Sequence, residues 1–295
     1  MPRIFPLLAL LALAACQAEP ATQAPPATRS VRDDLGRTLA WPAHPRRILA
    51  LAPSMTEMLW AVADTATIVG RTQNDNYPPA ATRRPVVNTY PLDLERLVAL
   101  RPDAVLTVEG MTAPADAQRL QELGVPVYYQ RYRTVEDVFT GLETLGRLLN
   151  RAAPAHQLAD SLRRELKTLA TPAAPARPVP SVLAITWQDP IYCYGQNTLF
   201  TDEIRLAGGQ NAVRESFAQP FPALTREYIL KLNPDVLLGG RLGKLDSTFF
   251  KNYPELRRIR AYQTRRVFPI TGDLVERPSP RVVEAVRELK KLLTQ

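Results

Sequence analysis

The amino-acid sequence predicts an α/β protein built from two related lobes, each with a mainly parallel sheet, joined by one long helix. Three observations support this fold class. Short apolar runs alternate with helical segments, the second half of the chain repeats the pattern of the first, and an amphipathic segment separates the halves. At 295 residues the chain is long enough for two lobes of ordinary domain size.

The composition is that of a folded protein and argues against several classes of function. Hydrophobic residues make up 45% and charged residues 22%, which supports a packed core and excludes global disorder. The net charge of +8 comes from lysines and arginines scattered among acids, and even the densest group, residues 257–266, carries no nucleic-acid-binding motif. We therefore expect no nucleic-acid partner. Two cysteines, Cys16 and Cys193, give no disulfide framework, and two histidines, His44 and His156, argue against a histidine-rich metal site.

The first 16 residues have the features of an export signal. Arg3 precedes an apolar run, residues 4–15, that is too short to span a bilayer. The run ends in Leu-Ala-Ala-Cys at residues 13–16, which resembles the bacterial lipobox and predicts lipidation of Cys16; a plain secretory signal with an incidental cysteine is the alternative. We expect residues 1–16 to be a lipoprotein signal peptide. The protein is then placed in the periplasm or at the cell surface, lipid-anchored to a bacterial membrane.

Residues 17–44 are predicted to form a tether and an N-terminal extension. Up to Thr28 the segment is rich in Ala, Pro, Gln and Thr and has no apolar periodicity, which is typical of a flexible linker. Residues 31–37 then fit a short hairpin.

The first predicted lobe, residues 45–150, alternates strands with helices. A helix is expected over residues 93–100, with Asp93 as its N-cap, and it stops before Pro102. Brief apolar runs predict strands at residues 47–51, 104–108 and 125–129.

Another helix of this lobe is expected to begin at a capping box. Ser54 would accept a hydrogen bond from the third helical N–H, and Glu57 would complete the box in a helix that runs to about Val62. The box explains Glu57 by its place at the helix start, without a role in a binding site.

The second predicted lobe, residues 179–295, repeats this pattern. A strand at residues 181–186 leads to a helix around residues 202–206, and a helix over residues 225–232 precedes a strand at residues 236–238. Four positions of the second half match the first at identical spacing: Glu227 to Glu95, Ile229 to Leu97, Pro234 to Pro102 and Asp235 to Asp103. The repeat predicts two related lobes in place of one long sheet.

Residues 151–178 are predicted to link the lobes through a helix and an exit loop. Residues 155–170 are amphipathic at helical period, with four leucines on one face, and a proline-rich stretch ends the helix. A single linking helix would resist the wide hinge opening that flexible crossovers permit. The C-terminal helix, residues 281–293, is expected to pack back on the second lobe.

Five short runs occur in a fixed order along the chain: residues 47–57, 76–79, 94–103, 225–235 and 276–281. Together they resemble the periplasmic iron-siderophore and cobalamin-binding family, and most closely its cobalamin-binding members, over about residues 45–293. The resemblance implies a class III periplasmic binding protein, in which two Rossmann-like lobes are joined by a long rigid helix and hold the ligand in the cleft between them. It also implies that the protein docks on the permease of an ABC transporter.

Two glutamates are implicated in docking by this resemblance. In the family's cobalamin-binding members one surface glutamate on each lobe pairs with arginines of the permease, and these correspond to Glu95 and Glu227. The alternative is local, because Asp93 and Thr225 look like N-caps, and acids in a first helical turn gain roughly 0.3–1 kcal/mol from the helix dipole. Both explanations can hold, since the dipole does not consume the carboxylate.

The resemblance also implies ligand-binding residues. The corresponding positions are Asn74, Tyr90, Tyr192, Phe221, Asp273 and Arg277. Tyr90 and Phe221 stand where cobalamin-binding members carry tryptophan, and Asn74 stands where they carry tyrosine, so the aromatic area is reduced. Each ring has an ordinary core position as its alternative, and Arg277 has a surface ion pair with Glu276 or Asp273 as its alternative.

The expected cargo is a corrinoid, cobalamin or another metal chelate, with no intrinsic cofactor and no resident metal. Haem is the alternative, with Tyr90, Tyr192 or Tyr194 as an axial ligand. A ferric siderophore is a further alternative, which would need convergent cations such as Arg71 or Arg131. Cys193 is expected to be a half-buried apolar side chain, with a soft metal ligand as its alternative.

A catalytic function is not expected. An exported hydrolase would need a nucleophile with its base or a metal cluster, and the sequence has no GxSxG, HExxH or Gly-rich phosphate loop. We therefore expect a monomeric, non-enzymatic carrier whose partners are an ABC transporter permease, a small-molecule metal chelate and, through the lipid anchor, a membrane.

Overall fold

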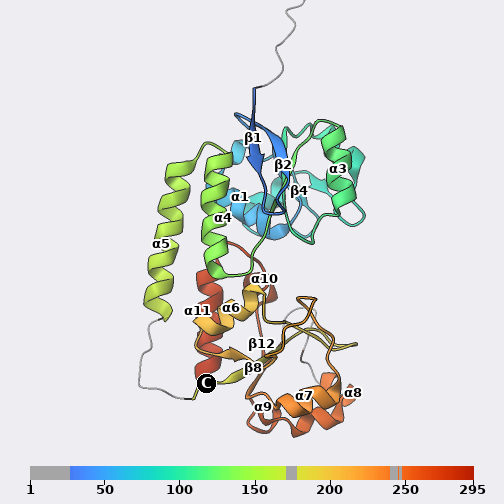
Figure 1. Cartoon of the computed structure of the whole chain (residues 1–295), viewed down its shortest axis with the longest axis vertical. Helices are drawn as coiled ribbons and strands as arrows, with labels where there is room; N and C mark the ends of the chain where they lie inside the picture. Colours follow the sequence, from blue (N-terminus) through green and yellow to red (C-terminus); the bar gives the residue numbers. More distant parts are fainter. Residues whose placement is uncertain (1–26, 171–177, 240–244, 246–247) are drawn as a thin grey trace, which may run out of the picture.

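The computed structural model describes residues 27–170, 178–239, 245 and 248–295. The predicted signal peptide with Cys16, and most of the tether, lie outside these residues. The described chain forms two lobes placed one above the other, with long helices along one side (Figure 1). Among the described helices, none is long and apolar enough to cross a membrane.

The N-terminal lobe contains parallel strands covered by helices. Strands β3, β6 and β7 form one parallel sheet in that order, and β4 pairs with β5, also in parallel. The strands of this lobe are β3 (Ile48–Ala50), β4 (Arg71–Thr72), β5 (Val86–Val87), β6 (Ala104–Val108) and β7 (Val127–Gln130). Its helices are α1 (Pro53–Val62), η1 (Thr65–Thr67), η2 (Pro79–Arg83), α2 (Leu94–Ala99), α3 (Pro114–Glu122) and α4 (Val135–Leu148).

The N-terminal extension folds against this lobe. Strands β1 (Thr28–Arg32) and β2 (Thr38–Pro42) form an antiparallel hairpin, which confirms the hairpin predicted from sequence. Trp41 is fully buried, with its ring edge-on to Tyr128 at 5.9 Å between centroids. Burying a tryptophan contributes roughly 2–3 kcal/mol, so the hairpin belongs to the folded body and not to the tether.

The C-terminal lobe repeats the architecture around a five-stranded sheet. Strands β10, β8, β11 and β12 run in parallel in that order, and β9 pairs antiparallel with β8. The strands are β8 (Ser181–Trp187), β9 (Tyr192–Cys193), β10 (Gln210–Asn211), β11 (Val236–Gly239) and β12 (Val267–Pro269). The helices are α6 (Leu199–Leu206), α7 (Arg226–Leu232), α8 (Phe249–Asn252), η3 (Pro254–Arg258), α9 (Arg260–Gln263), α10 (Gly272–Val275) and α11 (Val282–Thr294).

The internal repeat seen in the sequence has a structural basis. The strand order β3-β6-β7 of the first lobe corresponds to β8-β11-β12 of the second, all in parallel. Asp103 accepts the backbone N–H groups of Arg46 (2.7 Å) and Arg47 (3.1 Å) before β3, and Asp235 accepts the backbone N–H of Ser181 (2.9 Å) at the start of β8. In each lobe the repeated aspartate therefore ties the first strand of the main sheet, β3 or β8, to the turn before the neighbouring strand, β6 or β11.

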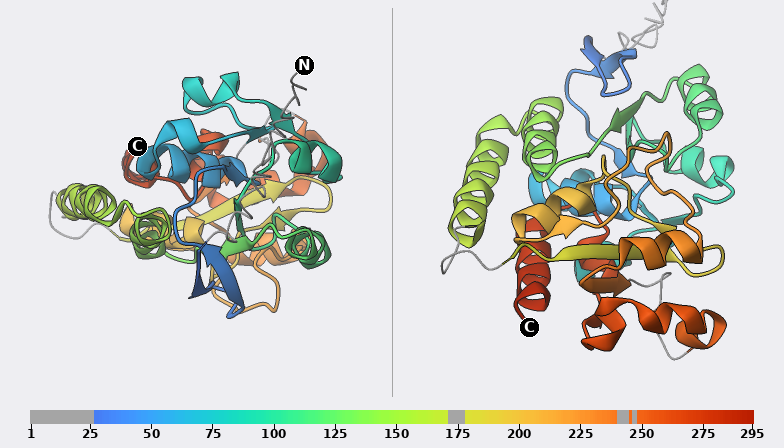
Figure 2. Two further views of the ribbon diagram at one scale, coloured as in Figure 1. Left: turned by 90° about the horizontal axis from the view of Figure 1, so that it is seen from above. Right: turned by 60° about the horizontal axis from the view of Figure 1, so that its bottom comes forward.

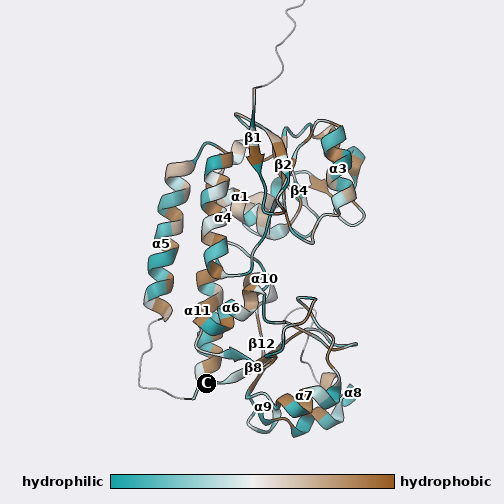
Figure 3. Cartoon of the chain, viewed as in Figure 1, coloured by the Kyte–Doolittle hydropathy of each residue, from teal (hydrophilic) through white to brown (hydrophobic). Residues whose placement is uncertain are grey.

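Helices bridge the two lobes along one side of the molecule. Helix α5 (Ala152–Ala170) confirms the predicted linking helix; it packs antiparallel beside α4 and also contacts α11 of the second lobe (Figures 1 and 2). Its leucines pack against a core that contains residues of both lobes, and polar residues occupy its outer side (Figure 3). Helix α11 confirms the predicted C-terminal helix. This shared core joins the lobes into one packed body.

The capping box predicted at the start of α1 is wrong. The helix begins at Pro53, its N-cap is Ala52, and no side chain caps it. Proline is suited to the first helical position because its φ is already helical and it has no N–H to satisfy. Ser54 and Glu57 therefore lie inside the helix, where both are buried.

Candidate functional site

A cleft of about 590 Å³ lies between the two lobes. Residues 108–111 and 132–133 line it from the N-terminal lobe, and residues 194, 198–200, 220–221 and 275–278 line it from the C-terminal lobe. Ligand pockets of this size, formed by two lobes, are where small-molecule binding proteins hold their cargo. The cleft is therefore the candidate ligand site.

Aromatic rings of the C-terminal lobe form one wall of the cleft. Tyr194 stacks on Phe200 with ring centroids 4.3 Å apart, and Phe221 stands edge-on to Tyr194 at 5.5 Å. Phe221 is exposed and Tyr194 is buried. The sequence predicted Phe221 as a ligand residue but assigned no role to Phe200, which lies in the first turn of α6.

The hydroxyl of Tyr194 is engaged inside the wall. It forms a hydrogen bond with Glu276, another residue of the cleft lining. Burial, together with the nearby carboxylates, raises the pKa of Tyr194 well above its ordinary value. Tyr194 therefore presents a neutral phenol ring to the cleft, and not a phenolate.

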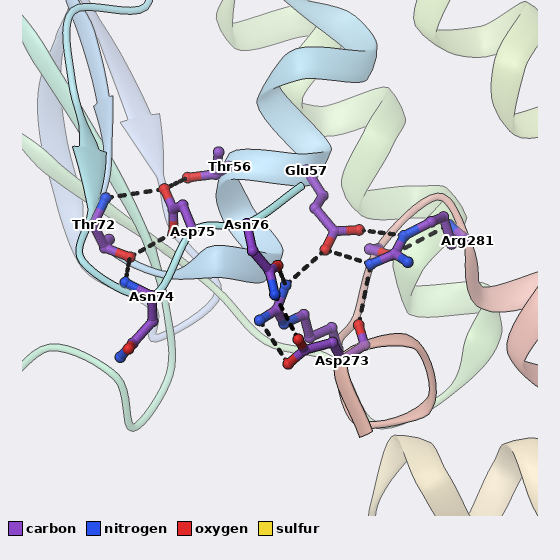
Figure 4. A network of polar contacts seen from close by, with 10 residues as sticks. Thr56, Glu57, Thr72, Asn74, Asp75, Asn76, Asp273 and Arg281 are labelled. Carbon is purple, nitrogen blue, oxygen red and sulfur yellow. Dashed lines mark hydrogen bonds and ion pairs between the residues drawn. The ribbon is translucent and has the colours of Figure 1, made fainter. Parts of the chain in front are cut away.

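The six predicted ligand residues do not all lie on the cleft. Phe221 and Arg277 line it, whereas the other four are not among the lining residues. Tyr90 is 94% exposed. Asn74 lies on the loop after β4, and its side chain points away from the neighbouring polar network (Figure 4). Asp273 accepts a hydrogen bond from Arg277 (2.8 Å) and is not among the residues that line the cleft.

Five residues at one edge of the cleft connect the lobes; we call them the inter-lobe clasp. They are Glu57 and Asn76 of the N-terminal lobe and Asp273, Arg277 and Arg281 of the C-terminal lobe (Figure 4). The carboxylate of Glu57 accepts hydrogen bonds from Nη1 of Arg277 (3.1 Å) and from Nη2 and Nε of Arg281 (2.7 and 2.8 Å).

The outer part of the clasp joins the loop after β4, which carries Asn76, to α10, which carries Asp273. Asn76 accepts a hydrogen bond from Arg277 (2.7 Å) and donates one to Asp273 (2.6 Å), which in turn accepts from Arg277 (2.8 Å). The ion pair between Asp273 and Arg277 is the one that the sequence offered as the alternative role of Arg277.

Buried side chains hold the clasp in position. The loop that carries Asn76 is fixed by Asp75, which is buried and accepts hydrogen bonds from the hydroxyl of Thr56 (2.6 Å) and the backbone N–H of Thr72 (2.9 Å). The guanidinium of Arg281 also lies 4.1 Å from the centroid of the Tyr77 ring, which is cation–π geometry.

The clasp buries its charges deeply. The side chains of Glu57, Arg277 and Arg281 are 1%, 11% and 19% exposed. Removing one partner of a buried ion pair costs about 3–5 kcal/mol, because the remaining charge is left without compensation. The clasp is thus a strong fixed contact between the lobes, and sequence reasoning missed it because Glu57 and Arg281 are 224 residues apart.

A second polar contact joins the lobes near the opposite edge of the cleft. The backbone N–H of Val135, at the start of α4, donates to Asp202 of α6 (2.9 Å). Helix α4 is also closed by a capping box between Thr134 and Asp137. The acid from the other lobe therefore satisfies an N–H that the helix leaves free, at its positive end.

The two glutamates predicted to dock the permease occupy equivalent places. Both are exposed in the first turn of a short helix, Glu95 in α2 and Glu227 in α7. The predicted N-caps are confirmed: Asp93 accepts the N–H of Arg96 (2.9 Å) and Thr225 accepts that of Tyr228 (3.2 Å). The helix backbone and the Thr225 side chain lower the pKa of Glu227, so this carboxylate keeps its negative charge.

Two other places in the structure contain residue types that can bind metal ions. Cys193 is fully buried, more than the sequence predicted, and burial raises the pKa of its thiol, which disfavours the thiolate that metals require. Glu143, His156 and Asp160 gather on α4 and α5. There the guanidinium of Arg163 already bonds Glu143 (2.7 Å) and Asp160 (3.3 Å), so this surface group is an ion-pair network.

Comparison with known proteins gives a family. The model of the family described as "Periplasmic binding protein" matches residues 48–274. An uncharacterized ABC transporter substrate-binding lipoprotein of Bacillus subtilis is 28% identical over 96% of this chain and 93% of its own length. A vitamin B12-binding protein of Vibrio parahaemolyticus is 25% identical over 82% of this chain and 87% of its own length.

Solved structures share the fold over most of this chain. A possible iron-binding protein of Staphylococcus epidermidis superposes with a TM-score of 0.76 at 25% identity, covering 85% of this chain and 99% of that one. The haem-binding protein BhuT, bound to two haems, gives 0.74 at 25% identity, covering 85% and 100%. The vitamin B12-binding protein BtuF of Vibrio cholerae gives 0.74 at 23% identity, covering 85% and 97%. The fold predicted from sequence, two α/β lobes with a cleft between them, is confirmed.

Proposed function

The chain belongs to the periplasmic binding protein family, and on that premise we propose that it is the substrate-binding lipoprotein of an ABC importer whose cargo is a corrinoid. The cleft between the lobes carries this proposal. Its wall of Tyr194, Phe200 and Phe221 offers stacking surface to the flat face of a macrocycle, and a small number of polar groups surround it. Relatives that bind vitamin B12 support the same cargo.

Haem is the competing cargo, and a ferric siderophore stands beside it. A solved structure of the same fold binds haem, and another is described as possibly iron-binding. Haem ligation by tyrosine needs an accessible phenolate. Tyr194 is buried, neutral and bonded to Glu276, while Tyr90 and Tyr192 lie outside the cleft lining. This arrangement favours a corrinoid, whose metal needs no protein ligand of that kind.

The test is an equilibrium titration of the purified protein with cyanocobalamin, haem, a ferric hydroxamate and a ferric catecholate. Micromolar or tighter binding of cyanocobalamin, with weaker or no binding of the others, is the expected result. Saturable haem binding with a charge-transfer band, and no cobalamin binding, would replace the corrinoid by haem. Binding of none of the four chelates would contradict the proposal as a whole.

A substitution in the cleft wall tests whether the ligand binds there. Phe221→Ala removes an exposed ring from the wall and is expected to weaken cyanocobalamin binding about ten-fold, since an aromatic stacking contact contributes roughly 0.5–1.5 kcal/mol beyond its buried area. Tyr262→Ala is the matched control, because Tyr262 is a similarly exposed aromatic residue outside the cleft lining. Equal affinities for the two variants would argue that the cargo binds elsewhere.

A further inference from the structure

A second hollow opens beside the ligand cleft; we call it the arginine pocket. It has a volume of about 450 Å³ and shares Arg133 and Thr198 with the cleft lining, so the two hollows are adjacent. Both lobes contribute to it: Arg133 and Thr134 come from the N-terminal lobe, and α6 and β10 provide residues of the C-terminal lobe. It therefore lies between the lobes, as the cleft does.

The two hollows differ in charge. The charged residues that line the cleft balance, as Glu109 and Glu276 face Arg133 and Arg277. The arginine pocket is lined by three arginines, Arg133, Arg205 and Arg214, and by one carboxylate, Asp202. Glu109 of the cleft pairs with Arg133 and Asp202 pairs with Arg205, so the unbalanced positive charge of this lining is that of Arg214. An excess of positive charge at the end of a neutral cleft attracts a negatively charged part of a ligand.

The one carboxylate of the arginine pocket is already committed. Asp202 accepts the N–H of Val135 with one oxygen and the guanidinium of Arg205 with the other. Among the described residues Arg214 has no carboxylate partner and makes a single hydrogen bond, to Gln210 (3.1 Å). A guanidinium carries five N–H donors, so Arg205 and Arg214 keep donors for an oxyanion.

The clasp makes the other end of the cleft unsuitable for an anion. Arg277 is the cation that the sequence placed at the ligand, and in the structure Glu57 and Asp273 neutralise it. A carboxylate placed there would face two acids as well as the guanidinium. The charge of an anionic ligand is better matched at the arginine pocket.

We propose that the arginine pocket is a subsite for the oxyanion, a carboxylate or a phosphate, that a metal chelate carries on a flexible side group. The chelate's ring occupies the cleft, and its charged group reaches Arg214 and the remaining donors of Arg205 in the C-terminal lobe. This inference rests on the proposed function, and it adds the charge of the cargo to it.

The experiment uses pairs of chelates that differ in the anionic group. Cyanocobalamin, whose side loop contains a phosphodiester, is compared with dicyanocobinamide, which lacks it. Haem, with its two propionates, is compared with haem dimethyl ester. Each is titrated into the wild-type protein and into the Arg205→Gln, Arg214→Gln double variant. The double variant Arg119→Gln, Arg257→Gln, at exposed positions outside both hollows, is the control for net charge.

In the pair that the wild-type protein binds, the anionic member is expected to lose roughly five- to ten-fold in affinity in the double variant, as expected for lost charge-assisted hydrogen bonds. The neutral member should be unaffected, and the Arg119→Gln, Arg257→Gln variant should change the affinity for neither member. An equal effect on both members, or no effect on the anionic one, overturns the subsite and leaves the proposed function standing. If the wild-type protein binds no chelate, the proposed function itself has failed.

Discussion

Two buried glutamates occupy the same place in the two lobes but have opposite surroundings. Glu57 is the fifth residue of α1 and Glu203 is the fifth residue of α6, and each helix follows the first strand of the main sheet of its lobe. Glu57 meets two guanidinium groups of the other lobe. Both carboxylate oxygens of Glu203 are buried, and neither has a hydrogen-bond partner among the described residues.

The difference shows what the internal repeat provides. It builds the same scaffold twice, including a buried acid at the same helical position, and the opposite lobe decides what that acid does. In the N-terminal lobe the acid becomes the centre of the clasp. In the C-terminal lobe burial raises the pKa of Glu203 well above its ordinary value, so that it is held as a neutral acid.

The largest expected effect concerns the two exposed glutamates that occupy equivalent places in the two lobes. We propose that Glu95 and Glu227 dock on the permease. Reversing both, Glu95→Lys with Glu227→Lys, is then expected to reduce ligand uptake by cells to background. Ligand affinity of the purified protein should stay unchanged, since neither residue lines the cleft. The control is the double reversal Glu122→Lys with Glu165→Lys, at exposed positions of α3 and α5. Normal uptake in the first variant would refute the docking role.

The next effect tests the clasp. Glu57→Gln leaves Arg277 and Arg281 without their shared carboxylate and is expected to lower the free energy of unfolding by about 3 kcal/mol. Urea unfolding followed by circular dichroism measures it. The isosteric change Glu203→Gln, at the matching position, should not destabilise the protein. A loss under 1 kcal/mol in Glu57→Gln would mean that the clasp contributes little to joining the lobes.

Glu203 makes the stability depend on pH in a defined direction. In the unfolded chain its carboxyl titrates near 4.5, whereas the folded protein holds the proton to higher pH. Folding therefore takes up a proton between these values, and the stability falls by about 1.4 kcal/mol per pH unit from pH 4.5 up to the folded pKa. Glu203→Gln should remove this decline and be more stable than wild type at pH 7. Parallel curves for the two proteins across this range would contradict the buried neutral acid.

The smallest effect concerns the turn that ends the repeated helix. Arg101 and Asn233 occupy equivalent positions of the internal repeat, directly before Pro102 and Pro234. Both have a positive φ, 47° and 43°. Asparagine tolerates this left-handed conformation better than arginine. Arg101→Asn should therefore raise the free energy of unfolding by about 0.5 kcal/mol, measured by urea unfolding. Asn233→Arg should lower it, since this change also removes the hydrogen bond that Asn233 accepts from the backbone N–H of Arg260 (2.7 Å). A loss of stability in Arg101→Asn would show that the side-chain contacts of Arg101 outweigh backbone strain.

The sequence predicted the scaffold well because its signals are local or periodic. The strands, the linking helix, the C-terminal helix and the N-caps Asp93 and Thr225 follow from apolar runs, helical spacing and capping residues. The repeat predicted the lobes, since Pro102 and Asp103 recur as Pro234 and Asp235 with the same spacing.

The candidate site was predicted only in part because its contacts join distant segments. Ser54 and Glu57 matched a local capping pattern, although Pro53 is itself a signal for the first helical position. Nothing local in the sequence shows that Arg281 approaches Glu57 from the other lobe. Phe221 and Arg277 reach the cleft as predicted. The arginine pocket brings together positions from the turn before α4, from α6 and from β10 that no spacing in the sequence connects.

The most direct test of the account is hydrogen–deuterium exchange with and without a saturating concentration of the chelate that binds most tightly. If the ligand lies between the lobes, as we propose, its binding should slow exchange in both lobes together. The expected segments are residues 108–111 and 132–134 of the N-terminal lobe and residues 194–201 and 220–221 of the C-terminal lobe. Protection confined to one lobe, or to segments outside the cleft and the arginine pocket, would contradict it.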